Sequence, residues 1–482
     1  MKKFCFLFSL VLAVVSANAQ SNNGFGGPGG GPGGDPGGSS SVAYSNGATL
    51  LITSAGTYAG KTYTQTGSDY NVVKDTCATA TLSRCTLTKT GATSSSGDNS
   101  SFYGINAAVY CSKTGNLTLN DCNVTTNADG ANAFFCYNGG TLTLNRDTCV
   151  NNATRSRGLH CTGGNGATIY ANDCYVVTKK ETSSTIATDR GGGTVYVNGG
   201  YYEANGGKCA IVYSTGDMYV TGITGYSNSS EQGDIADIEG DNLIVIDSCQ
   251  LTCAGTSRGV MLYQSGSGDA SGYNPTMRIS NSTLTLTSSE ASLCEVPTAV
   301  DAYLTLDNCK LSVPSSVLAY VHTNSNWNNT NEKELFLTLK NGTYTGALNH
   351  DATGNITVSL DAATVWQGTI NADNNTNTTA DTVVVNGTWI MDGDAFPDVL
   401  IINKGGKVYT NGHTLSYTTL TNNGTLDTTT TGITAGIAQT IADTKDTGSA
   451  GRIYSLTGER ISCVPSQGVY IVNSKKYIAS AK

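Results

Sequence analysis

The chain has 482 residues, of which only 13% are charged, and its formal net charge is −9. No basic patch or run of Lys and Arg is present to bind nucleic acid or anionic lipid, so the composition excludes a nucleic-acid-binding protein. Gly (58 residues) and Tyr (25 residues) are abundant, as are Thr, Ser and Asn. This composition favours many short strands and tight turns over helices.

Residues 1–19 are typical of a secretory signal peptide. Lys2 and Lys3 precede an apolar run that starts at Cys5, and the sequence Ala17-Asn18-Ala19 provides a small-x-small cleavage site. No later run of apolar residues is long enough for a transmembrane segment. We therefore expect an exported chain, secreted or held at the cell surface by other means.

Residues 20–45, rich in Gly, Pro and Ser, are expected to form a flexible tether. Residues 46–426 then repeat a unit of 25 to 27 residues, seen in LTLNDC, which ends at Cys122, and in LTLDNC, which ends at Cys309. Each unit is an alternating strand, an Asx-type turn and a second strand. Because so short a unit cannot bury its own apolar face, it must stack on its neighbours. The repeat predicts an all-β fold, a right-handed parallel β-helix of roughly 12 to 14 coils.

The alternation of apolar and polar residues predicts which side chains face the core. In one repeat, Leu117, Leu119, Cys122 and Val124 should point inward, whereas Thr118 should point outward. The equivalent outward column reads Thr118, Thr143, Tyr170, Tyr196, Tyr219, Val245, Arg278, Thr305 and Thr338. A second column, at the turns, should stack in a ladder of its own and contains Asn120, Asn172, Asn198, Asp247 and Asp307. We expect these side chains to bond to backbone groups where the chain bends.

Fourteen cysteines remain after signal cleavage, and their spacing leaves two interpretations open. Cys111, Cys136 and Cys161 are 25 residues apart, as are Cys149 and Cys174, so they should form columns of stacked, buried thiols. The expected Cα spacing of about 4.8 Å also falls within disulfide range, so disulfides between coils are the alternative. The sequence has no paired CxxC motifs of the kind that would indicate a zinc site.

Loops of uneven length are expected at 91–101, 265–275 and 322–333. Residues 354–425 still read as strand-turn units without cysteine, which predicts the terminal part of the same solenoid. A linker at 427–450 should follow, and then a small β-rich module at 451–482. In that module the apolar alternation of Val469 and Ile471 needs a partner strand, which the segment around Ile453 can supply.

Two segments resemble known families. The strings RGLHCTGGNGATIYANDC from Arg157 and RGVMLYQSGSGDASG from Arg258 resemble secreted β-helix proteins of gut microbes, which are described as adhesin-like and in some cases as carbohydrate-binding. The last residues, from Gly451, are similar to the C-terminal tail of exported Bacteroidota proteins, with Ser474 where Gly is usual. The resemblance implies a surface adhesin whose tail directs secretion or attachment.

The β-helix is also a scaffold of polysaccharide lyases and hydrolases, which need a base beside calcium-binding acids or a pair of carboxylates across a cleft. The densest acidic cluster contains Glu231, Asp234, Asp237, Glu239 and Asp241. We expect it to be a solvated loop at one turn, with calcium binding as the alternative.

The other polar candidates are also expected to be structural. Asp189 and Arg190 should form a salt bridge within a turn, and Arg157 and Arg258 should bond to carbonyl groups of adjacent coils. His160 is expected to be exposed. No catalytic residue, metal ligand or cofactor is therefore predicted.

The outward tyrosines are the candidate ligand-binding residues. Tyr170, Tyr196 and Tyr219 fall in one column on successive coils, and Tyr175 and Tyr201 point outward on the neighbouring strands. Rings at this spacing are expected to form a flat strip on which sugar rings could stack. The alternative is that the tyrosines only stabilise the strands.

The sequence thus predicts a secreted or surface-held β-helix that binds a polysaccharide or cell-surface glycan without catalysis. A polysaccharide lyase or glycoside hydrolase and a purely structural stalk are the alternatives.

Overall fold

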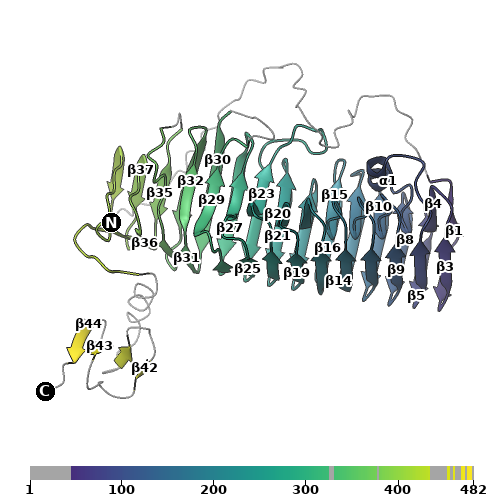
Figure 1. Ribbon diagram of the computed structural model, residues 1–482, viewed down its shortest axis with the longest axis horizontal. Helices are drawn as coiled ribbons and strands as arrows, with labels where there is room; N and C mark the ends of the chain where they lie inside the picture. The colour runs from purple at the N-terminus through teal and green to yellow at the C-terminus, as the bar shows by residue number, and fades with distance from the viewer. Residues whose placement is uncertain are drawn as a thin grey trace, which may run out of the picture.

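The computed structural model describes residues 45–324, 331–376 and 379–434, and four short strands between 453 and 479. The main body is a parallel β-solenoid of about 13 coils, which forms the long rod in Figure 1. The predicted fold class is confirmed. The expected signal peptide, most of the tether and most of the linker lie outside the described residues.

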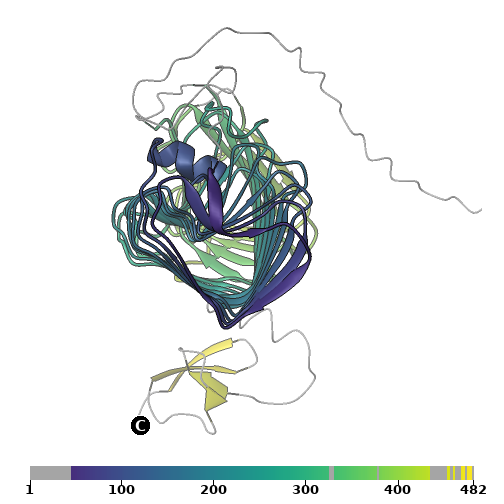
Figure 2. The same ribbon diagram turned by 90° about the vertical axis from the view of Figure 1, so that its right-hand side faces the viewer.

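Most coils contribute one strand to each of three parallel stacks, A, B and C, and Figure 2 looks along the rod at the superposed coils. Stack A consists of β1 (Gly47–Ile52), β4 (Tyr70–Asp75), β7 (Val109–Ser112), β10 (Phe134–Tyr137), β13 (Leu159–Thr162), β15 (Ile186–Asp189), β17 (Cys209–Ser214), β20 (Gly233–Glu239), β23 (Arg258–Tyr263), β26 (Ser292–Val296), β29 (Val317–Val321) and β32 (Ala347–His350).

Stack B runs the whole length of the rod and carries the predicted strand before each turn. It consists of β2 (Gly56–Ala59), β5 (Thr79–Ser83), β8 (Asn116–Asn120), β11 (Thr141–Asn145), β14 (Thr168–Thr178), β16 (Thr194–Ala204), β18 (Asp217–Thr221), β21 (Leu243–Asp247), β24 (Thr276–Ser280), β27 (Asp301–Asp307), β30 (Lys333–Lys340), β33 (Gly354–Leu360), β35 (Thr382–Val385), β37 (Val399–Ile402) and β39 (Thr419–Asn422).

Stack C carries the strand after each turn. It consists of β3 (Thr62–Gln65), β6 (Thr86–Lys89), β9 (Asn123–Thr126), β12 (Thr148–Asn151), the second halves of β14 and β16, β19 (Thr224–Ser227), β22 (Gln250–Cys253), β25 (Thr283–Leu286) and β28 (Lys310–Ser312). In the last coils a separate stack D takes over this role, with β31 (Thr343–Thr345), β34 (Val365–Gln367), β36 (Thr388–Ile390), β38 (Lys407–Tyr409) and β40 (Thr425–Asp427).

The predicted register is confirmed in the coil that contains β8 and β9. Leu117, Leu119, Cys122 and Val124 are buried in the core that runs along the rod, while Thr118 is half-buried on the outer face. Burial of each such side chain contributes about 1.5–3 kcal/mol, which explains why the alternation fixes the register. The outward column also stacks as predicted, with the pairs Thr118–Thr143, Thr143–Tyr170, Tyr170–Tyr196, Tyr196–Tyr219, Tyr219–Val245, Val245–Arg278, Arg278–Thr305 and Thr305–Thr338 in register.

The Asn side chains at the turns stack in a ladder as expected, but they bond to one another and not to the backbone. Asn145 Nδ2 donates to Asn120 Oδ1 at 2.9 Å, and Asn172 Nδ2 donates to Asn145 Oδ1 at 2.9 Å. Identical amides at one-coil spacing satisfy each other along the rod, because the coil repeat brings their polar atoms within hydrogen-bond distance. This amide ladder lies beside the outward column.

The thirteen cysteines in the described part of the chain are free thiols, and all except Cys77 are buried. Cys111, Cys136 and Cys161 stack as predicted. Cys149 does not stack on Cys174 and instead pairs with Val124 and Val176. The equal spacing was misleading because this coil is longer: Asn145 pairs with Asn172, 27 residues further on, so a cysteine 25 residues after Cys149 falls two positions short of its register partner, Val176.

One element was not predicted. The segment expected to be a loop at 91–101 contains most of a short helix, α1 (Gly97–Tyr103), whose N-cap Ser96 Oγ accepts a hydrogen bond from the Asn99 nitrogen at 3.2 Å. A helix of seven residues is too short to show a helical apolar period. Figure 1 shows α1 beside β10, and Thr162 Oγ1 of β13 donates to the Phe102 carbonyl of α1 at 2.9 Å, so α1 covers part of stack A.

The C-terminal coils continue the solenoid as predicted, and their core contains Trp366 stacked on Trp389 with ring centroids 5.2 Å apart. The expected tail module forms an antiparallel sheet of β41 (Ile453–Ser455), β42 (Arg460–Ile461), β43 (Gly468–Val472) and β44 (Lys475–Ala479). Among the residues that the structure describes, no helix is both long and apolar enough to cross a membrane.

Candidate functional site

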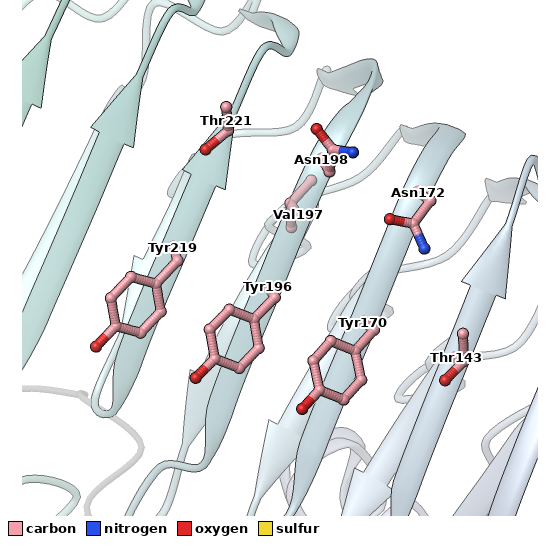
Figure 3. Close-up of a pocket in the computed structure, with 8 residues that line it drawn as sticks. All are labelled: Thr143, Tyr170, Asn172, Tyr196, Val197, Asn198, Tyr219 and Thr221. Carbon is pink, nitrogen blue, oxygen red and sulfur yellow. The ribbon is translucent and has the colours of Figure 1, made fainter.

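Three tyrosines stand in a row on the outer face of stack B. Strands β14, β16 and β18 hold Tyr170, Tyr196 and Tyr219 in register on consecutive coils. Their neighbours along each strand are buried, so the alternation forces the rings outward. Tyr170 and Tyr196 are 42% and 40% exposed. Figure 3 shows the three rings side by side with their hydroxyl groups pointing the same way.

The rings overlap obliquely. The centroids of Tyr170 and Tyr196 are 5.1 Å apart with planes 8° from parallel, and those of Tyr196 and Tyr219 are 5.0 Å apart at 10°. Near-parallel faces in contact are only about 3.5 Å apart, so each ring must be offset from the next. The three rings are therefore stacked with an offset and do not form the flat strip that we expected. Part of each ring face stays uncovered by its neighbour.

An open groove of about 430 Å³ runs beside this row. It is lined by Thr143, Tyr170, Asn172, Tyr196, Val197, Asn198, Tyr219 and Thr221. The groove thus lies between the tyrosine row and the turn column that continues the amide ladder, and it spans the coils of β11, β14, β16 and β18 (Figure 3). We call it the tyrosine groove.

The two other predicted tyrosines belong to a second row, on stack C. The rings of Tyr175 and Tyr201 stack with centroids 5.0 Å apart. Tyr226, which the sequence analysis missed, tilts at 42° against Tyr201, although its own register partner is Glu203. The Tyr201 hydroxyl donates to Glu203 Oε2 at 2.5 Å. The five predicted residues therefore divide between two rows, and only three of them line the groove.

Only the two ends of the acidic cluster, Glu231 and Asp241, are exposed outside a strand as we expected, and its other three members are not in a solvated loop. Asp234, Asp237 and Glu239 belong to the buried strand β20 of stack A, and Asp234 and Asp237 are only 1% and 8% exposed. Arg258 Nε lies 2.9 Å from Asp234 Oδ2, and Arg258 Nη1 lies 2.6 Å from Glu295 Oε2. The sequence misled us because loops and α1 cover the outer face of stack A, so polar side chains on that face become buried ion pairs.

Within this cluster the pKa values of two carboxyl groups, Asp237 and Glu295, are shifted in opposite directions. Burial and the neighbouring Asp234 carboxylate raise the pKa of Asp237 well above its ordinary value. Burial also opposes ionisation of Glu295, but the hydrogen bond from His322 and the charge of Arg258 outweigh it and hold the pKa of Glu295 at about 2. His322 Nε2 lies 2.9 Å from Glu295 Oε1. Arg258, His322 and Asn324 thus occupy the two oxygens of the Glu295 carboxylate.

Our expectations for Arg157, Arg258, Asp189 and His160 were wrong. Both arginines pair with buried carboxylates rather than with carbonyl groups, and Arg157 Nη2 lies 2.9 Å from Asp189 Oδ2. Arg190, which we expected to pair with Asp189, lies 3.1 Å from Asp269. His160 is fully buried, and burial lowers its pKa to about 4.

Arg157 and Arg190 attach α1 to the solenoid. Arg157 Nη1 donates to Ser101 Oγ at 2.6 Å, and the guanidinium groups of Arg157 and Arg190 lie 5.3 Å and 4.4 Å from the Phe102 ring centroid. Charged side chains that are paired and covered in this way have a structural role. The sequence contained a signal for these arginines, because an Arg-Gly pair begins two of the stack A segments. The carboxylate partners of the arginines could not be identified without the register of the strands.

The lining of the tyrosine groove offers ring faces, hydroxyl groups and amides, which are groups that can stack on a ligand or form hydrogen bonds with it. Within the described ranges, no three His, Cys, Asp or Glu side chains are grouped so that they could hold a metal ion.

Comparison of the chain with protein-family models, with curated proteins and with solved structures finds no match. A functional assignment therefore depends on the geometry of the tyrosine groove.

Proposed function

We propose that this protein is a glycan-binding β-solenoid that holds a polysaccharide in the tyrosine groove. The observation that supports the proposal is the row of offset-stacked, outward-facing rings of Tyr170, Tyr196 and Tyr219 beside a groove lined with amides and hydroxyls. Aromatic side chains provide a large apolar surface and a hydroxyl group at low entropic cost, which suits ligands with both apolar faces and polar edges. Sugar rings have this character.

The stalk alternative explains less of this surface. Elsewhere in the outward column Thr118, Thr305 and Thr338 occupy equivalent positions, so a stable coil does not require an aromatic residue there. Three outward-facing rings on consecutive coils, two of them exposed and one half-buried, lie next to an open groove and favour a ligand. Stacking between the rings contributes about 0.5–1.5 kcal/mol per pair, so the row also stabilises the rod.

We propose that binding occurs without catalysis. A glycoside hydrolase requires two carboxyl groups that reach the substrate from opposite sides. No carboxylate lines the tyrosine groove, and the carboxyl groups of stack A that could form a pair, such as Asp237 and Glu295, are 8% and 4% exposed. Their burial argues against the lyase and hydrolase alternatives.

The proposed setting is outside the cell, secreted or at the surface, with the tail at 451–482 as a sorting signal. Cell fractionation of a strain that expresses the chain without residues 451–482 tests the sorting role. We expect a folded solenoid that no longer reaches the surface. Unchanged surface display would contradict the sorting role.

The binding proposal is tested by pull-down on insoluble polysaccharides. The double variant Tyr196→Ala/Tyr219→Ala should lose binding while the thermal midpoint falls only slightly, because both rings lie on the outer face. Tyr303→Ala is a matched control: Tyr303 is a 40% exposed tyrosine of stack B that stacks on Phe336 at 4.8 Å, outside the groove. It should bind like the wild type. Equal binding by the double variant would reject the proposal.

A further inference from the structure

We infer that the ligand of the tyrosine groove is an uncharged polysaccharide that lies along the rod axis and contacts at least three consecutive coils. The inference rests on the proposed function and specifies the chemical class, the direction and the minimum length of the ligand.

The direction follows from the repeat of the groove. Each of three consecutive coils supplies one ring, at centroid spacings of 5.1 Å and 5.0 Å along the rod. A linear polymer that runs along this row can make a similar ring contact on every coil, whereas a chain that crosses the rod meets only one ring. Contacts repeated along one chain add to affinity, because the second and third contacts are made within a single complex.

The amide ladder provides hydrogen-bond donors along the same line. An Asn side chain has two N–H donors, and Asn172 uses one of them to reach Asn145 Oδ1 at 2.9 Å. The second N–H is not needed for the ladder. Asn172 and the exposed Asn198, which are in register, both line the groove. They can donate to the hydroxyl and ring oxygens of sugars while the polymer covers the tyrosines.

The charge of the surroundings disfavours an anionic polymer. None of the eight side chains that line the groove is charged. At one end, Asp247 is the register partner of Thr221. Hydrogen bonds from Ser280, Asn281 and Ser248 lower the pKa of Asp247, so this carboxylate is ionised at neutral pH.

Further charges do not reverse this preference. Asp217 lies on β18, two residues before Tyr219, and the whole chain carries a net charge of −9. Arg278, a cation in the same outward column, lies two coils beyond Tyr219 and does not line the groove. A polymer of uronic acids would therefore be repelled, most strongly at low ionic strength.

The test for charge uses pairs of polymers with the same backbone. Neutral polysaccharides such as glucomannan and mixed-linkage β-glucan are each compared with a form oxidised at C6 to the carboxylate, by affinity electrophoresis of the folded wild-type chain. We expect retardation by a neutral member and at least tenfold weaker retardation by its oxidised partner. Equal or stronger binding of the oxidised member would overturn the inference.

The test for length uses oligosaccharides of the polymer that binds, from one to six sugars, measured by calorimetry. Affinity should rise steeply until the oligomer spans three rings and then level off. Asn198→Ala should weaken binding of the long oligomers at least several-fold. Asn403→Ala, which breaks a similar amide pair with Asn386 outside the groove, should not.

The outcomes separate the two claims. If the wild type binds no polysaccharide, or if it binds one and the tyrosine double variant binds equally well, both the proposed function and the inference fail. If binding requires the tyrosines but a single sugar binds as tightly as the hexamer, only the inference fails.

Discussion

Asp147 Oδ1 accepts a hydrogen bond from the backbone nitrogen of Cys122 at 2.6 Å, across the boundary between two adjacent coils. The other oxygen of Asp147 accepts from the Asn145 nitrogen at 2.9 Å. A buried carboxylate thus occupies the inward position that Cys122 holds in its own coil. Farther along the rod a serine accepts the equivalent backbone hydrogen bond: Ser282 Oγ accepts from the Cys249 nitrogen at 3.0 Å.

This carboxylate should make stability depend on pH. Burial raises the pKa of Asp147 from 3.8 to about 7. Between these values the folded chain holds a proton that the unfolded chain has lost, so stability falls as pH rises from about 4 to about 7, by at most about 4 kcal/mol. Asp147→Ser keeps an acceptor for Cys122 and removes the titration. The thermal midpoint of the variant should rise relative to that of the wild type as the pH increases from 4 to 8. A constant difference would contradict the assignment.

A second titration should act in the opposite direction. His350 Nε2 lies 2.7 Å from Asp381 Oδ2, and both side chains are buried. Burial opposes the charge on the ring, but the hydrogen bond and charge of Asp381 outweigh it and raise the pKa of His350 above 6.5. The stabilisation is complete below pH 6.5 and is lost as pH rises through the raised value. His350→Gln should therefore cost more stability at pH 5 than at pH 9, and an equal cost at both would exclude the charged pair.

The register of the coils predicts a contrast between two adjacent positions. Leu119→Asp places a charge in the core and should cost several kcal/mol. Thr118→Asp places the same charge on the outer face, where Thr118 is half-buried, and should change stability by no more than about 1 kcal/mol. Thermal denaturation of both variants measures the contrast. Similar losses would mean that the two side chains do not face opposite sides of the strand.

The buried ion pairs of stack A predict a large effect for one arginine. Arg258→Met leaves the Asp234 and Glu295 carboxylates without their cation and should cost about 3–5 kcal/mol. The control, Arg146→Met, removes an exposed pair with Asp121 and should cost far less, because solvent screens exposed ion pairs. Comparable denaturation midpoints for the two variants would show that the Arg258 cluster contributes little.

The sequence was informative where each strand has one face inside the solenoid and one outside. There the alternation at Leu117, Thr118 and Leu119 predicted both the core and the outward tyrosine column. It was uninformative for stack A, because strands such as β20 are buried on both faces and their acidic residues are typical, in sequence, of a surface loop. The offset of the tyrosine rings could not be predicted either, since it depends on the side-chain torsion angles and on contact between neighbouring rings.

The central claim, that a polysaccharide occupies the tyrosine groove, is tested most directly by hydroxyl-radical footprinting of the folded chain with and without a bound polymer. Tyr170 and Tyr196, which are 42% and 40% exposed, should be protected when the polymer binds. Tyr303 and Tyr320, which are 40% and 39% exposed and lie elsewhere on the rod, should keep their reactivity. Unchanged oxidation of Tyr170 and Tyr196 under saturating polymer, or protection of Tyr303 in their place, would contradict the account.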